Sequence, residues 1–180
     1  MDVLEAPAIT AQTIIDALIA DAPECIWATE LAFSSGARRI DFWKMEHHSS
    51  KGYRATAYEV KISRSDFKRD SHAKQREARL FSDCFYYVTP VGLVKPEEIP
   101  DWAGLIEFDG TRLSRKVAAP LRDKSCPSWE LVVSLIRNSG EIRRDVTLER
   151  KELLGLRRQK DEIKKKLEAK GLHPWEFGIW

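Results

Sequence analysis

The sequence predicts an α/β fold in which a central sheet is flanked by helices. Two segments, residues 38–45 (RRIDFWKM) and 56–62 (TAYEVKI), alternate polar and apolar residues with the period of two that is typical of strands. Two further runs, residues 84–89 (CFYYVT) and 104–108 (GLIEF), have the apolar character of buried strands and are bounded by Gly or Pro. Helical patterns lie before, between and after these segments, and this arrangement indicates an α/β domain.

The first half of the chain is expected to begin with two helices and continue with a hairpin. Residues 9–22 place Ile9, Ile14 and Leu18 on one helical face, with Thr10 or Thr13 available as the cap. Residues 25–33 are expected to form a second short helix that ends at the SSG segment. The connection EHHSSKG is polar and rich in turn formers, so strands 38–45 and 56–62 are expected to pair antiparallel.

The second half is expected to contain helices on either side of the two buried strands. Residues 66–81 carry apolar or small residues at helical spacing among many basic ones, with Ser65 or Asp66 as a cap, and PEEIPDW is expected to be a loop. A helix is expected from Ser128, followed by a charged helical stretch over residues 142–170 with an irregular apolar period. The expected division is therefore a main domain, residues 1–125, and a charged helical extension, residues 126–180, that is exposed or packed on a partner or on a second copy.

Composition indicates a single globular core and excludes a membrane protein. The 180 residues are 43% hydrophobic, and no stretch approaches the ~18 uninterrupted apolar residues that a membrane span requires. Acidic residues near the N-terminus do not match a secretory signal, so a cytoplasmic protein is expected. The three cysteines show no CxxC pair, and free, mostly buried thiols are expected. With a net charge of +2, binding to nucleic acid would require clustered basic residues.

Three polar residues on the two paired strands form the strongest candidate for a chemical site. Glu59 and Lys61 are two residues apart and therefore lie on one face of their strand, and Asp41 comes from the partner strand. Carboxylates in an otherwise apolar strand require compensation, and Mg²⁺ or Mn²⁺, which prefer oxygen ligands, would supply it. Such an ion serves phosphodiester hydrolysis, in which Lys61 would stabilise developing charge. Taken alone, the triplet equally fits the solvent face of an edge strand.

A wider resemblance favours the chemical interpretation. The succession of a helix with Glu30, a strand with Asp41 and a strand with Glu59-Val60-Lys61, followed by a helix and the strand CFYYVT, resembles the αβββαβ core of PD-(D/E)XK nucleases. The segment from EVKISRSDFKRD to GLIEF is similar to the MmcB-like, DNA-repair and phage-associated branch of that superfamily. One strand of the pattern is missing from the elements expected above, and Ile40 precedes Asp41 where the family name has proline.

The resemblance implies a restriction-endonuclease-like fold with a mixed central sheet, and a metal-dependent DNA nuclease active in repair or in phage DNA processing. It implies that Asp41, Glu59 and the carbonyl of Val60 bind Mg²⁺ or Mn²⁺, and that Lys61 is catalytic. Glu30 takes the place of the family's helical carboxylate, and either Lys74 or Gln75 of the following helix would face the site. The alternative is a DNA-binding or assembly module that keeps the nuclease fold without turnover.

The surroundings of the motif contain candidate contacts to DNA. Phosphate contacts from Lys and Arg supply most non-specific affinity for nucleic acid, and Arg64, Lys68 and Lys74 are the candidates, with Arg38, Arg39, Lys44, Arg54, Arg69 and Arg76 nearby in the sequence. A solvated helix face explains such residues equally well. Trp102, Trp129, Trp175 and Trp180 could stack on bases, although core packing is the commoner role of tryptophan. His47 and His48 are expected to be loop residues rather than zinc ligands.

Overall fold

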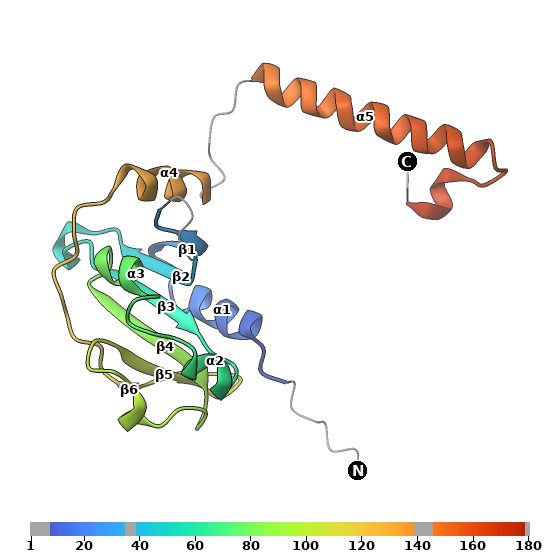
Figure 1. Cartoon of the computed structure of the whole chain (residues 1–180). Helices are drawn as coiled ribbons and strands as arrows, with labels where there is room; N and C mark the ends of the chain where they lie inside the picture. The colour runs from blue at the N-terminus through green and yellow to red at the C-terminus, as the bar shows by residue number, and fades with distance from the viewer. Residues whose placement is uncertain (1–7, 35–38, 139–145, 179–180) are drawn as a thin grey trace, which may run out of the picture. The chain divides into compact units, whose positions relative to one another are not determined.

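A six-stranded sheet is the centre of the computed structural model, which describes residues 8–34, 39–138 and 146–178 (Figure 1). In chain order the elements are α1 (Ala11–Ala20), β1 (Cys25–Ala32), β2 (Arg39–Glu46), the 3-10 turn η1 (Ser49–Lys51), β3 (Ala55–Val60), α2 (Arg64–Lys68), α3 (Arg76–Leu80), β4 (Cys84–Pro90), η2 (Pro96–Glu98), β5 (Gly104–Phe108), β6 (Leu113–Val117), α4 (Trp129–Asn138), α5 (Val146–Glu168) and η3 (Pro174–Phe177).

The strands lie in the sheet in the order in which they occur along the chain. β1 to β3 form an antiparallel meander, β4 and β5 run parallel to β3, and β6 returns antiparallel to β5. The sheet is therefore mixed, and the α/β class that the sequence predicts is confirmed. The expected antiparallel pairing of the second and third strands is also confirmed, with Phe42 opposite Tyr58 and Met45 opposite Ala55.

Helices cover both faces of the sheet. Successive strand residues point to opposite faces, so each face presents its own apolar side chains for helices to pack against. Ile14 and Leu18 of α1 belong to a core cluster that includes Phe42, Tyr58 and Tyr86. A second cluster on the opposite face is made by Trp43, Ala57, Phe85 and Tyr87 with Ala78 of α3 and Leu131 of α4. The start of α1 is as expected, since the Thr10 hydroxyl accepts a hydrogen bond from the Thr13 amide.

Residues 25–33 are not a helix, and that expectation was wrong. Residues 25–32 form β1, which pairs with β2 from Cys25 opposite Glu46 to Ala32 opposite Arg39. The segment contains Ile26, Trp27 and Thr29, residue types that favour strands, and pairing with β2 overrides its weak helical pattern. With β1, three strands precede α2, one more than the sequence predicted.

The helix expected over residues 66–81 is also corrected, because it is interrupted. α2 begins after Ser63, whose hydroxyl accepts from the Asp66 amide, and a turn over residues 69–75 separates it from α3. Inside that turn one oxygen of Asp70 accepts from the Ser71 amide at 2.8 Å and the other accepts from Gln75 at 2.8 Å. Asp side chains compete with helical hydrogen bonds in this way, and here the competition ends the helix.

The chain divides into two compact units, Met1–Gly140 and Glu141–Trp180. The boundary between the units lies later than the expected one after residue 125. α4 belongs to the first unit, because Leu131 packs in its core and Asn138 donates a hydrogen bond to the Thr29 carbonyl of β1. The second unit contains the expected long charged helix, α5, whose Leu153, Leu156 and Ile163 are about half exposed. The three cysteines are free as expected, but none is fully buried: Cys25 and Cys84 are half-buried and Cys126 is exposed, which corrects the expectation of mostly buried thiols. No helix among the described residues is long and apolar enough to span a membrane.

Candidate active site

Asp41 of β2 lies beside β3 at the point where the pairing of the two strands ends. The paired residues run from Met45 and Ala55 to Phe42 and Tyr58, so the antiparallel register continues with Asp41 next to Glu59. There the Val60 amide donates a 2.7 Å hydrogen bond to Oδ2 of Asp41. Because a side-chain oxygen accepts this bond, Asp41 is held against β3 next to Glu59.

Lys61 is buried at the end of β3 among carboxylates. Its side chain is 8% exposed, and its Nζ donates to Oε1 of Glu59 at 2.8 Å. The same Nζ lies 3.4 Å from Oδ2 of Asp66 and 3.5 Å from Oδ2 of Asp70. The sequence expectation that Glu59 and Lys61 share a face is confirmed by this contact, which joins the two side chains directly.

Asp70 and Gln75 connect the interrupted helix to the site. The Asp70 side chain is 3% exposed, and Gln75, itself 5% exposed, donates from Nε2 to Oδ2 of Asp70 at 2.8 Å. Of the two candidates on this segment, Gln75 therefore contacts the site network, whereas the Nζ of Lys74 donates to the Arg69 carbonyl. Sequence reasoning missed Asp66 and Asp70 as site residues. Their signal was a pair of carboxylates at i and i+4 in a basic segment that closely follows Lys61.

Burial raises the pKa of both strand carboxylates, Asp41 and Glu59, so they hold protons more tightly than exposed carboxylates do. Desolvation, followed by the negative charge of Asp41, raises the pKa of Glu59 from its usual 4.5 to about 7. Desolvation also raises the pKa of Asp41, with Glu30 adding to the effect, although the hydrogen bond from Val60 opposes it. Two neighbouring carboxylates that resist ionisation are a site where an added cation would replace protons.

Lys61 keeps its positive charge in this setting. Burial by itself would lower the pKa of Lys61, but the hydrogen bond from its ammonium to Glu59 and the charges of Glu59, Asp70 and Asp66 raise it overall. One ammonium group thus stands among Asp41, Glu59, Asp66 and Asp70, and negative charge is in excess. That excess favours a second cation near the two strand carboxylates.

The donor set fits a small oxygen-binding cation. Oε2 of Glu59 is buried and has no hydrogen-bond partner in the part of the chain that the structure describes, an arrangement that costs free energy unless a ligand compensates. Within the described ranges no group of three or more His, Cys, Asp and Glu side chains is arranged to hold a metal. The carboxylate oxygens of Asp41 and Glu59 are the ligand type that suits Mg²⁺, which is typically held by one or two carboxylates and retains several waters.

Glu30 approaches the site from a strand and not from a helix, which corrects the expected element. It lies in β1 with an unusual positive φ of 49° and is an exposed residue. Its neighbours Thr29 and Leu31 pair with Phe42 and Ile40, so Glu30 stands next to Asp41 across the strands. Its charge contributes to the raised pKa of Asp41.

The three candidate DNA contacts differ in whether their side chains already bond to other residues of the chain. Arg64 is held by Glu98 through two hydrogen bonds of 2.9 and 2.6 Å and also donates to the Leu93 carbonyl. Lys68 is exposed and has no ion pair or hydrogen bond from its side chain to the described residues. Lys74 is half-buried and bonded to the Arg69 carbonyl. Arg38 and Trp180 lie outside the described residues.

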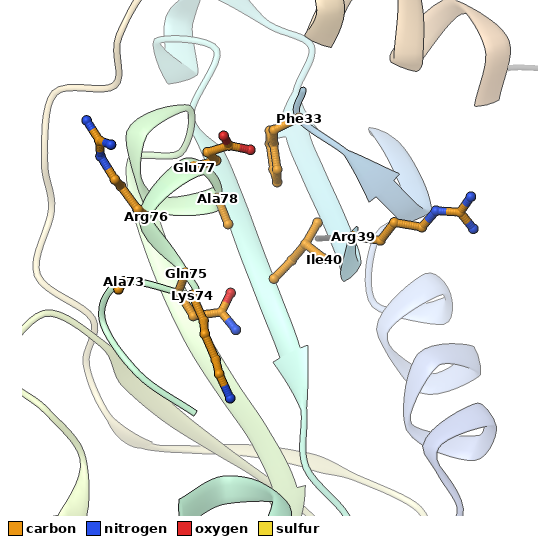
Figure 2. Close-up of a pocket in the computed structure, with 9 residues that line it drawn as sticks. All are labelled: Phe33, Arg39, Ile40, Ala73, Lys74, Gln75, Arg76, Glu77 and Ala78. Atoms are coloured by element: carbon orange, nitrogen blue, oxygen red, sulfur yellow. The ribbon is translucent and has the colours of Figure 1, made fainter. Parts of the chain in front are cut away.

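A pocket of about 300 Å³ opens on the α3 side of this site (Figure 2). Phe33 and Ile40 lie on one side of it, and Gln75, Glu77 and Ala78 lie on the other. Figure 2 shows the side chains of Arg39 and Arg76 directed away from the pocket in opposite directions.

Comparison with known proteins finds a similar fold in a solved structure. No protein-family model matches the chain, and no curated protein matches it. One solved structure with a similar fold is SPO1766, a protein of unknown function from Silicibacter pomeroyi. It is 20% identical, with a TM-score of 0.54, and the similarity covers 87% of this chain and 94% of that one.

Proposed function

We propose that the protein is a metal-dependent DNA nuclease with a restriction-endonuclease-like core. The order α1, β1, β2, β3, α2 with α3, and β4 corresponds to the αβββαβ succession of PD-(D/E)XK nucleases once β1 is counted. In that comparison Asp41, Glu59 and Lys61 occupy the positions of the family's acidic and basic site residues. DNA repair or processing of phage or mobile-element DNA is the corresponding role.

The observation that carries the proposal is the buried Oε2 of Glu59 beside Asp41 and Lys61, an oxygen that has no hydrogen-bond partner among the described residues. A purely structural Glu–Lys pair would not require a second carboxylate and an unused buried oxygen, whereas a cation site uses both. In the proposal, Asp41, Glu59 and the Val60 carbonyl hold Mg²⁺ or Mn²⁺. When bound, the ion supplies Lewis-acid chemistry at the scissile phosphate.

The chain's own residues would perform the remaining tasks. Lys61 presents a permanently charged ammonium to the phosphate, and charge that is already oriented stabilises a developing anion without reorganisation. Asp70, which accepts a hydrogen bond from Gln75, would hold Lys61 through a second carboxylate contact besides Glu59. Lys68, exposed at the end of α2, would contact the DNA backbone away from the reacting phosphate.

A non-catalytic DNA-binding or assembly module is the second candidate, and one observation favours it. Lys61 already bonds to Oε1 of Glu59, so the ammonium neutralises part of the charge that would attract a metal ion. In a module of this kind Lys61 would serve the stability of the fold and would contribute nothing to turnover. The two candidates differ in whether any DNA is cut.

The deciding experiment incubates the protein with labelled single-stranded, duplex, flapped and branched DNA in Mg²⁺, in Mn²⁺ and in EDTA. Cleavage that requires a metal and falls by a factor on the order of 10² or more in Lys61→Arg, which keeps the charge but not its geometry, supports the nuclease. Glu59→Gln should abolish cleavage together with metal binding, while the exposed Glu97→Gln serves as a matched control. Tight DNA binding without cleavage under any condition would favour the binding module.

A further inference from the structure

A second pocket, of about 270 Å³, lies next to the Lys61–Asp70 pair on the β4 side of the site. Its lining includes the rings of Phe67, His72, Tyr87 and Trp102, together with Lys68 and Asp70. Asp70 thus contacts the candidate active site through Lys61 and also lines this pocket. Whatever occupies the pocket lies directly beside the proposed reaction centre.

The aromatic rings of the pocket pack against one another and against the core of this face of the sheet. Phe67 meets the edge of Tyr87 at 5.2 Å between ring centroids, and Tyr87 lies 5.9 Å from Trp102. Phe67 and Trp102 pack against the core cluster of this face, and the guanidinium of Arg79 lies 4.4 Å from the centroid of Trp102. His72 stands edge-on to Trp102 at 5.7 Å and is exposed. The walls are rigid, and His72 forms part of an accessible rim.

The chemistry of the lining suits a flat heterocycle with polar edges. Aromatic walls favour a planar ring, and nucleobases are commonly recognised by stacking between such side chains. The volume lies just below the ~300–1,000 Å³ typical of pockets for drug-sized ligands, so a single heterocycle is a better fit than a larger molecule. The hydroxyl of Ser71, an exposed residue that also lines the pocket, can bond to a polar edge of the base, and Lys68 at the rim offers positive charge for the attached phosphate.

We infer that this pocket receives one unpaired nucleobase of the DNA that is cut at the neighbouring site, an inference that rests on the proposed nuclease function. A base inside a duplex is stacked on both faces and paired along its edge, so it cannot enter an aromatic pocket without leaving the helix. The substrate class that follows is single-stranded DNA or DNA with overhangs, flaps or frayed ends.

The test measures binding without metal, so that no cleavage interferes. Fluorescence anisotropy compares a blunt duplex, the same duplex with a single-stranded thymidine overhang, and the same overhang built from abasic residues. The base-bearing overhang should bind about tenfold more tightly than the abasic one, equivalent to about 1.4 kcal/mol and within the range of stacking on aromatic side chains. Equal affinity for the two overhangs would overturn the inference.

Variants assign the base preference to this pocket. His72→Ala removes an exposed rim ring, and Trp102→Leu keeps apolar volume but removes the stacking surface; both should lose most of the preference. His48→Ala and Trp27→Leu are matched controls, because both side chains are exposed and neither lines the pocket. If Trp102→Leu does not fold, the result for His72→Ala decides. A preference that survives in His72→Ala places the bases elsewhere and overturns the inference.

Cleavage assays on the same three DNAs separate this inference from the proposed function. Cutting of the blunt duplex as fast as the overhang, with no preference for bases, would leave the nuclease intact and overturn the base pocket. Base-dependent binding with no cleavage in Mg²⁺ or Mn²⁺ would keep the pocket as a binding site and overturn the nuclease. Absence of binding to all three DNAs would overturn both.

Discussion

Lys61 and Asp70 lie 3.5 Å apart, measured from Nζ to Oδ2, although one belongs to the end of β3 and the other to the turn between α2 and α3. Both side chains are nearly inaccessible to solvent, with exposures of 8% and 3%. The same Asp70 oxygen accepts from Gln75. The interrupted helix is therefore joined to the central strands by a buried charge contact, and the turn cannot move without changing the surroundings of Lys61.

The first prediction concerns this buried ion pair and does not depend on function. Lys61→Met should lower the free energy of unfolding by about 3 kcal/mol, because it leaves several carboxylates near a buried position without their cation. Asp70→Asn, which can still accept from Gln75, should cost less, and the double variant should show coupling of about 1 kcal/mol or more. Denaturant unfolding of the four proteins measures the cycle. The control is Lys51→Met, whose ion pair with Glu46 is solvent-exposed and should therefore contribute far less to the free energy of unfolding than the buried pair does. Equal costs at the two lysines would contradict the buried network.

The second prediction concerns the cation. Mg²⁺ or Mn²⁺ at about 100 times its dissociation constant should stabilise the wild type by about 2.7 kcal/mol, and Asp41→Asn should abolish most of that gain. The Asn side chain can still accept the Val60 amide hydrogen, so stability without metal should be retained. Glu107→Gln is the matched control, because Glu107 is a buried strand carboxylate that accepts the Gly92 amide hydrogen but lies on β5. Thermal unfolding with and without metal measures the difference. An undiminished metal response in Asp41→Asn would exclude Asp41 as a ligand.

The third prediction concerns pH. Because burial raises the pKa of Glu59 from 4.5 to about 7, the folded state holds a proton that the unfolded state releases between these values. The stability contributed by the neutral carboxyl is fully present below about 4.5 and is lost as the pH rises through about 7. In EDTA the wild type should therefore lose stability over this interval relative to Glu59→Gln, which cannot ionise. Saturating Mg²⁺ should reverse the trend at the upper end, since the ion binds the ionised form. Parallel pH profiles of the two proteins in EDTA would rule out the raised pKa.

The fourth prediction distinguishes the basic residues near the motif. Lys68→Ala should lower the slope of log affinity for DNA against log salt by about one, as expected for the loss of one phosphate contact. Arg64→Ala should change the slope less, because the guanidinium is already bonded to Glu98 and to the Leu93 carbonyl. Binding titrations at several salt concentrations measure both slopes. The opposite order of effects would show that the Arg64–Glu98 pair opens when DNA binds.

Local pattern alone was sufficient for the strands that carry the site. Residues 39–46, 55–60, 84–90 and 104–108 are strands at nearly the expected bounds, because polar–apolar alternation in the first two and apolar runs bounded by Gly or Pro in the last two are properties of the chain itself. For the same reason, their spacing was enough to predict that Glu59 and Lys61 lie on one face of their strand. The position of Asp41 beside them could be predicted because its strand was expected to pair antiparallel with theirs.

Only the tertiary structure decided the elements whose local signal was ambiguous. Residues 25–32 became a strand because β2 offered an edge to pair with, a contact between segments that no local pattern records. Asp70 and Gln75 joined the site because the helix is interrupted around Asp70, which places Asp70 against Lys61 and Gln75 against Asp70. The aromatic pocket exists because Phe67, Tyr87 and Trp102 converge from three separate segments. Such convergence depends on the packing of distant parts of the chain, whereas periodicity depends only on neighbouring residues.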